Sequence, residues 1–235
     1  MGISGVGQLI TSRNTGVTAQ TATFTADPTT MGNAFLLSIV YSTRTTAVSS
    51  VASSNATWSR LSTRQPTTFS TPTLEHWIGI PTGTAPATVT VTWGAALPSV
   101  TVELDAQEFT AYGPGTTWAL DGALGIAENG ASTTITFPTM TAPGAGAGEL
   151  YWGKCLYTAG TLSGGAPASF TFPTVNASAG PIAYNPALLG AATPTITVSA
   201  SGPSAGSAIL LAATAPASPP HPALARQALA RGALR

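Results

Sequence analysis

Three carboxylates lie close together on one predicted strand, the run 100–109. Side chains alternate between the faces of a strand, so Glu103 and Asp105 share one face with their Cα atoms about 6.5–7 Å apart, and Glu108 lies beyond a bulge. A carboxylate pair at such a distance can supply the acid and the base of glycoside hydrolysis. The chain offers no second carboxylate cluster and no basic substrate clamp, so we expect these acids to be solvated on the outer face of the strand. A hydrolase that uses them remains the least favoured hypothesis.

Nucleophilic catalysis has few possible bases, because the chain contains only two histidines, His76 and His221. The segment 202–206 matches the letters of the G-x-S-x-G nucleophile motif, but that motif requires a strand-to-helix turn. Here it joins two predicted strands, and no acid follows Ser204, so we predict an ordinary turn. His76 shares a strand face with Leu74 and Ile78 and is expected to be partly buried and hydrogen-bonded.

The sequence gives little indication of a metal site or of a redox-active cysteine. Cys155 is the only cysteine, so no intrachain disulfide can form, and its apolar predicted strand favours an inert core thiol. Metal sites need clustered histidine, cysteine or carboxylate ligands, and no such cluster is visible. A calcium site that combines backbone carbonyls with Asp27, Asp121 or Glu128 stays open. We predict no catalytic residue, no resident metal and no cofactor.

Tryptophans near polar residues could contact sugars, as aromatic side chains do in many β-sandwiches. The candidate glycan contacts are Trp58, Trp77, Trp93 and Trp118. A tryptophan on an alternating strand is more often part of the core, so glycan binding is kept as an alternative.

Charged residues make up 7% of the 235 residues, against roughly 25% in ordinary soluble domains. Most enzyme mechanisms need such ionisable groups, so the composition favours a non-enzymatic structural or binding protein. Residues 1–217 carry a formal charge of −3 and the last 18 residues +3, and no basic stripe suggests nucleic-acid binding. The N-terminal residues lack the pattern of a signal peptide, and no apolar run is long enough to predict membrane insertion.

Period-two alternation dominates the sequence and predicts an all-β protein. The run 87–93 alternates threonine with apolar residues, as a half-buried strand does, whereas more continuously apolar runs are expected to be central strands covered on both faces. We predict about twelve strands in an antiparallel, jelly-roll-like β-sandwich over residues 1–215. Further half-buried strands are predicted at 132–137, 168–172 and 193–199, central strands at 34–41, 149–157 and 207–213, and turns at 81–83, 113–115, 129–130, 143–144 and 164–165.

Residues 32–41 and 148–157 both run from glycine through apolar residues to tyrosine. An old duplication would explain this echo. We favour the other explanation, that two equivalent strands of one sandwich face the same constraints.

The chain ends in a Pro-rich linker, residues 216–222, followed by an Arg/Leu arm, residues 223–235, which is the only helix candidate. An isolated helix of this length is unstable in water, so the arm either orders against a partner or stays frayed. The candidate assembly residues are Leu224, Arg226, Leu229, Arg231, Leu234 and Arg235.

Residues 17–214 resemble a β-sandwich module of phage minor tail proteins and of some bacterial surface proteins. The features that carry the resemblance are Gly32-Asn33 before the strand that ends in 40–42, the segments 48–51 and 58–61, Leu74-Glu-His-Trp77, the run 87–93, Leu120-Asp121-Gly122, Glu149-Leu150 and the closing strand 208–211. The turn before Trp58 departs from the usual pattern of the module.

The resemblance implies a structural protein on the exterior of a bacteriophage virion, assembled in the host cytoplasm. A minor tail or tail-tip protein is the first expectation, and a capsid decoration protein or a carbohydrate-binding module is the alternative. The implied partners are other virion proteins, further copies of the chain in a homo-oligomer and host-surface glycan. The resemblance supplies no catalytic residue.

Overall fold

The computed structural model describes residues 2–143, 148–158, 160–173 and 180–217, and within them the chain forms fifteen strands and no helix. This confirms the all-β prediction, with more strands than expected. None of the described residues forms a helix with the length and hydropathy that a membrane span requires. The predicted arm, residues 223–235, and most of the linker lie outside the described residues.

The strands are β1 (Ser4–Val17), β2 (Thr21–Ala26), β3 (Ala34–Tyr41), β4 (Val48–Ala52), β5 (Ala56–Arg64), β6 (Thr73–Pro81), β7 (Ala87–Trp93), β8 (Val100–Thr110), β9 (Thr117–Thr136), β10 (Met140–Thr141), β11 (Glu149–Tyr157), β12 (Leu162–Ala166), β13 (Ile182–Leu188), β14 (Ala191–Ala192) and β15 (Thr195–Thr214).

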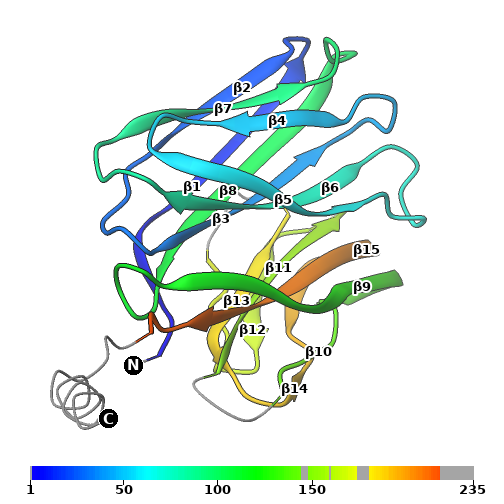
Figure 1. Cartoon of the computed structure of the whole chain (residues 1–235). Helices are drawn as coiled ribbons and strands as arrows, with labels where there is room; N and C mark the ends of the chain where they lie inside the picture. Colours follow the sequence, from blue (N-terminus) through cyan, green and yellow to red (C-terminus); the bar gives the residue numbers. More distant parts are fainter. Residues whose placement is uncertain (1, 144–147, 159, 174–179, 218–235) are drawn as a thin grey trace, which may run out of the picture.

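Strands β1–β8 form a jelly roll (Figure 1). One sheet has the order β1-β8-β3-β6-β5, and the sheet that faces it has the order β2-β7-β4. All pairings are antiparallel, and strands distant in sequence become neighbours, as the two Greek keys of a jelly roll require. The core between the two sheets is apolar and includes Leu37, Ile39, Val91 and Trp93. The jelly-roll prediction is therefore confirmed for this half of the chain.

Strands β9–β15 repeat the same order in shorter form. Strand β15 pairs with β9 and β11, and β11 pairs with β13, which gives the series β9-β15-β11-β13 in place of β1-β8-β3-β6. The small pair β10-β14 takes the place of β2-β7, and β12 pairs with the start of β15. The two apolar segments that echo each other are β3 and β11, which occupy equivalent positions in the two halves. The repeated topology therefore favours a duplication, the explanation that the sequence alone did not favour.

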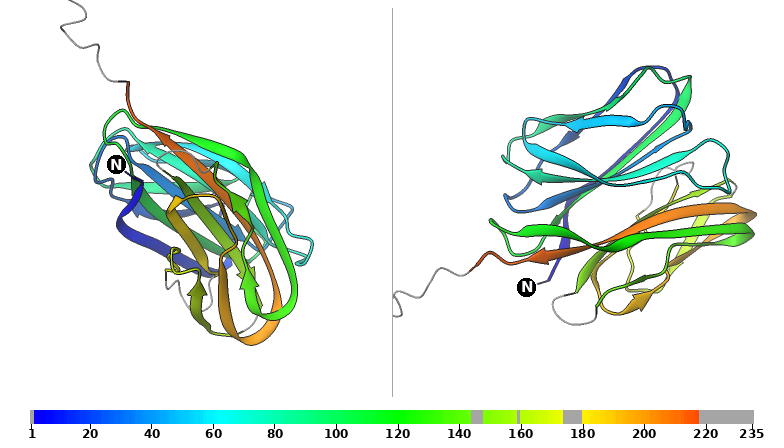
Figure 2. Two further views of the ribbon diagram at one scale, coloured as in Figure 1. Left: turned by 90° about the horizontal axis from the view of Figure 1, so that it is seen from below. Right: turned by 45° about the vertical axis from the view of Figure 1, so that its right-hand side comes forward.

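The two halves are stacked through the sheets that contain β3 and β11 (Figure 2). Consecutive residues of β3 point to opposite sides, so Leu37 joins the core of the first half and Leu36 packs toward the second. The shared core also contains Phe109, Trp152 and Leu211. Strands β3 and β11 are continuously apolar because both of their faces are covered, as predicted.

Two predicted turns lie inside long strands. Asn129 and Gly130 fall within β9, and the segment 202–206 falls within β15. The register between these strands shifts at Gly202, so a bulge absorbs the irregular residues without ending the pairing. The predicted strand 168–172 is also absent, since its backbone makes only an isolated bridge between Thr171 and Tyr184.

The shared core predicts that the two halves unfold together. Replacing Leu36, which is fully buried between them, with alanine should lower the free energy of unfolding by about 2–5 kcal/mol. Urea unfolding followed by circular dichroism should still give one transition. Leu189→Ala, at a side chain that is 62% exposed, is the control and should change stability by less than about 0.5 kcal/mol. Two separate transitions, with only one shifted by Leu36→Ala, would contradict this prediction.

Candidate functional site

A layer of buried polar side chains lies where the two halves meet. Ser38 on β3 is directly opposite His76 on β6 and Asp105 on β8, so the three side chains share the face that turns toward the second half. Lys154 on β11 and Ser207 on β15 are also cross-strand partners, and they meet this face from the other side. All five residues are buried.

The neutral part of the layer is a series of hydrogen bonds that runs from Trp152 through Ser38 and His76 to Ser207. Ser38 Oγ lies 3.1 Å from His76 Nδ1, and His76 Nε2 lies 2.8 Å from Ser207 Oγ. Trp152 Nε1 donates to Ser38 Oγ at 2.8 Å. Burial lowers the pKa of His76 to about 3, which keeps the imidazole neutral at pH 7. His76 is therefore hydrogen-bonded as predicted and more deeply buried than expected.

The charged part of the layer surrounds Lys154. Its Nζ donates to Asp105 Oδ2 at 2.7 Å, lies 3.3 Å from Glu103 Oε2 and also donates to the carbonyl of Gly180. Arg13 Nε lies 3.4 Å from Glu103 Oε1, and the Gly180 N–H donates to Glu103 Oε2 at 3.2 Å. The expectation that Glu103 and Asp105 are solvated is therefore wrong, because the second half covers the face on which they lie.

The surroundings of Lys154 favour its charged form. Burial alone lowers the pKa of Lys154, but the attraction of Asp105 and Glu103 outweighs this effect and raises it above its usual value. The two cations and two carboxylates of the cluster cancel in formal charge. Asp105 is hydrogen-bonded to Lys154 rather than to His76, so the orienting carboxylate of a Ser-His-Asp triad is not in place.

Glu108 lies apart from the other two acids. Its carboxylate accepts hydrogen bonds from the Thr29 N–H at 2.9 and 3.1 Å and from Asn33 Nδ2 at 2.7 Å, which fixes the turn before β3. It also lines a hollow of about 320 Å³ together with Asp27 and Phe35. The three carboxylates on β8 therefore do not form one site.

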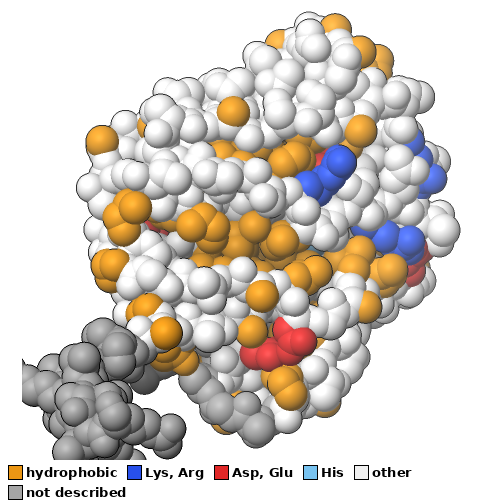
Figure 3. Space-filling view, in the orientation of Figure 1, with side chains coloured by type: hydrophobic (Ala, Val, Ile, Leu, Met, Phe, Trp, Pro, Cys, Tyr) orange, Lys and Arg blue, Asp and Glu red, His pale blue; other side chains and the backbone are white. Residues whose placement is uncertain are grey.

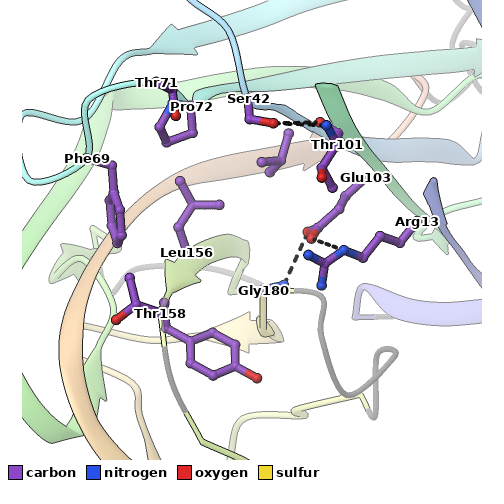
Figure 4. A pocket seen from close by; sticks show the side chains of 12 residues that line it. Arg13, Ser42, Phe69, Thr71, Pro72, Thr101, Glu103, Leu156, Thr158 and Gly180 are labelled. Atoms are coloured by element: carbon purple, nitrogen blue, oxygen red, sulfur yellow. Dashed lines mark hydrogen bonds and ion pairs between the residues drawn. The ribbon is translucent and has the colours of Figure 1, made fainter. Parts of the chain in front are cut away.

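A pocket of about 260 Å³ opens at the end of the charged layer (Figure 4). Arg13 and Glu103 lie on one side of it, and Phe69, from the connection between β5 and β6, lies across from them. The remaining lining residues are Val40, Ser42, Thr71, Pro72, Thr101, Leu156, Tyr157, Thr158 and Gly180. Charged, hydroxyl and apolar groups therefore converge in one concavity, the usual composition of a small-molecule site.

The predicted glycan tryptophans do not gather into one platform. Trp93 and Trp77 are buried in the first core, as the favoured expectation had it, so the alternative that their rings contact a sugar does not hold for these two. Trp58 is half-buried, and its Nε1 donates to Ser53 Oγ. Trp118, also half-buried, donates to the carbonyl of Gly32.

The other titratable residues of note lie at separate places in the fold. Cys155 is buried, and burial raises the pKa of its thiol, as expected for an inert core residue. Burial and a hydrogen bond with Asp121 raise the pKa of Glu149 to about 7. Desolvation of Glu128 is outweighed by hydrogen bonds from Thr67 and Thr68, which lower its pKa to about 2. No group of three or more potential metal ligands occurs within the part of the chain that the structure describes.

The sequence reasoning missed both the charged layer and the pocket. One signal was available, since Lys154 is the only lysine and stands in the middle of an apolar, centrally placed strand. A lysine at such a position needs a buried anionic partner, and the acids of β8 were the candidates.

Comparison with protein-family models, with curated protein sequences and with solved structures finds no match to this chain.

Removing the lysine should be strongly destabilising. Lys154→Met leaves Asp105 buried without a cation and Glu103 with Arg13 alone, and we expect a loss of about 3–5 kcal/mol in the free energy of unfolding. Adding Asp105→Asn should recover part of the loss, which urea unfolding would measure. Thr134→Met, at an exposed position on β9, is the control for the new side chain. A Lys154→Met protein within 1 kcal/mol of the original would contradict the prediction.

His76 should make the fold sensitive to acid. Its pKa is about 3 in the folded state and near 6.5 when unfolded, so below pH 6.5 only the unfolded chain takes up the proton. Its contribution to stability is complete above pH 6.5 and declines by about 1.4 kcal/mol per pH unit down to pH 3. Urea unfolding of the original and of His76→Gln at several pH values would isolate this slope, because the other groups are common to both. Equal slopes for the two proteins would refute it.

Proposed function

We propose that this protein is a non-enzymatic structural component of a bacteriophage virion, displayed on its exterior as a minor tail or tail-tip protein. The observation that carries the proposal is the buried polar layer between the two stacked halves. The side chains most capable of chemistry, including Lys154, Asp105 and His76, are buried there and bonded to one another. They hold two β-sheets together, which is a structural role.

The surface is suited to packing against other subunits. On the face seen in Figure 3, uncharged polar and backbone atoms predominate, an apolar band crosses the middle, and charged side chains are few. Among the described strands, β9 pairs only with β15, so its other edge has no strand partner. Leu120 and Ile126 on β9 are 40% and 49% exposed. An exposed, partly apolar edge strand is a common site of association, which supports contacts with other virion proteins or with further copies of the chain.

Two alternatives share the same fold. Jelly rolls occur in viral capsid proteins and in lectins, so a capsid decoration protein or a carbohydrate-binding module is also compatible with this architecture. The pocket beside Arg13 is the specific observation that favours carbohydrate binding. A tail protein that contacts host glycan would combine both functions.

The proposal predicts that the protein is part of phage particles. Particles induced from the source strain and purified on a density gradient should contain it, as detected by mass spectrometry. Antibody-gold labelling of intact particles should then place it on the tail, and labelling of the capsid would favour the decoration alternative. An antibody against a soluble host enzyme is the control. A protein that stays in the soluble lysate and never sediments with particles would refute the proposal.

A further inference from the structure

The pocket lies at the junction of the two halves and is built from both. Strands β1, β3 and β8 of the first half and β11 of the second contribute to its wall, together with the connection between β5 and β6. Its shape therefore depends on the packing that the charged layer stabilises. Its volume of about 260 Å³ is slightly below the roughly 300–1,000 Å³ of sites for drug-sized ligands, which suits a ligand of about one ring.

Arg13 presents hydrogen-bond donors without acceptors. Its Nε and Nη1 atoms are buried and have no hydrogen-bond partner, although Nε lies within ion-pair distance of Glu103. Buried polar groups in folded proteins nearly always have a partner, and the exceptions are informative about function. The Arg13 side chain as a whole is 24% exposed and lines the adjacent pocket, so a ligand oxygen there can accept a hydrogen bond from the exposed part of the guanidinium.

The charges beside the pocket select a neutral ligand. Arg13 is paired with Glu103, and Lys154 behind them is paired with Asp105 and Glu103, so the cluster has no net formal charge. An anion that approached Arg13 would meet the carboxylate of Glu103, and a cation at Glu103 would meet Arg13. A hydroxyl group avoids both penalties, since it can accept from Arg13 and donate to Glu103.

The opposite side of the pocket is apolar. Phe69 lies across the pocket from the Arg13–Glu103 pair, and Leu156 lies between them in the view of Figure 4. Thr71 and Thr158, both exposed, place hydroxyl groups at the lining. A sugar ring combines an apolar face with hydroxyl groups at its edge, and the pocket offers a matching surface to each.

We propose that this pocket binds one neutral sugar residue, with Arg13 and Glu103 bonded to its hydroxyl groups and Phe69 against its apolar face. That the sugar belongs to a host-surface glycan rests on the proposed function. Sugar binding itself does not.

Titration of the full chain with single sugars tests the proposal. Glucose, galactose, mannose, rhamnose and N-acetylglucosamine would be added separately and followed by saturation-transfer NMR and calorimetry, with acetate as an anionic probe. At least one sugar should bind, and Arg13→Met should weaken it by about tenfold or more, the loss expected for a charge-assisted hydrogen bond. Phe69→Ala should weaken the same sugar without touching the ion pairs. Arg60→Met, at an arginine that does not line the pocket, should bind as the original does.

Three results would overturn the proposal: no binding of any of these sugars, binding that Arg13→Met and Phe69→Ala leave unchanged, or binding of acetate in place of sugars. Thermal unfolding of each variant would establish that it is folded. If Arg13→Met does not fold, the sugar affinity of Phe69→Ala tests the proposal in its place. The outcome is independent of the particle experiment, because a protein absent from particles can still bind sugar, and a particle protein can lack sugar affinity.

Discussion

The ion cluster around Lys154 is the constraint on which the two-layer architecture depends. A lysine that is fully buried is tolerated only because Asp105 and Glu103 approach it from the opposite sheet, at 2.7 and 3.3 Å. Lys154 belongs to the second half and both carboxylates to the first, so the charge of Lys154 is neutralised only when the two halves pack together. The ion pairs and the apolar core between the halves therefore act on the same contact.

The stacked arrangement buries Lys154, Asp105 and His76 at the junction of the halves. Each half uses one sheet to cover the other, and the polar side chains between the two sheets are hydrogen-bonded to one another. The strand order β9-β15-β11-β13 of the second half follows the order β1-β8-β3-β6 of the first. Among the described strands, β9 pairs only with β15 and leaves its other edge without a strand partner.

The pocket is a consequence of the same junction. Where the charged layer reaches the pocket, Arg13 and the buried Glu103 lie across from Phe69. Residues that stabilise the fold thus also line the candidate sugar site. A displacement of the second half would therefore change the lining of the pocket as well as the packing between the halves.

The periodicity of apolar residues was sufficient to predict the positions of three strands. Strands β3, β7 and β11 coincide with the predicted runs, and the inert character of Cys155 follows from its apolar neighbours. An all-β fold with central strands buried on both faces thus follows from local patterns, since alternation and apolar runs act over neighbouring residues. The burial of Glu103 and Asp105, the enclosure of Trp77 and Trp93 in the core, and the pocket follow from how the sheets pack. Each of these depends on which distant sheet covers a given face, and that pairing joins residues far apart in the chain that no local pattern connects.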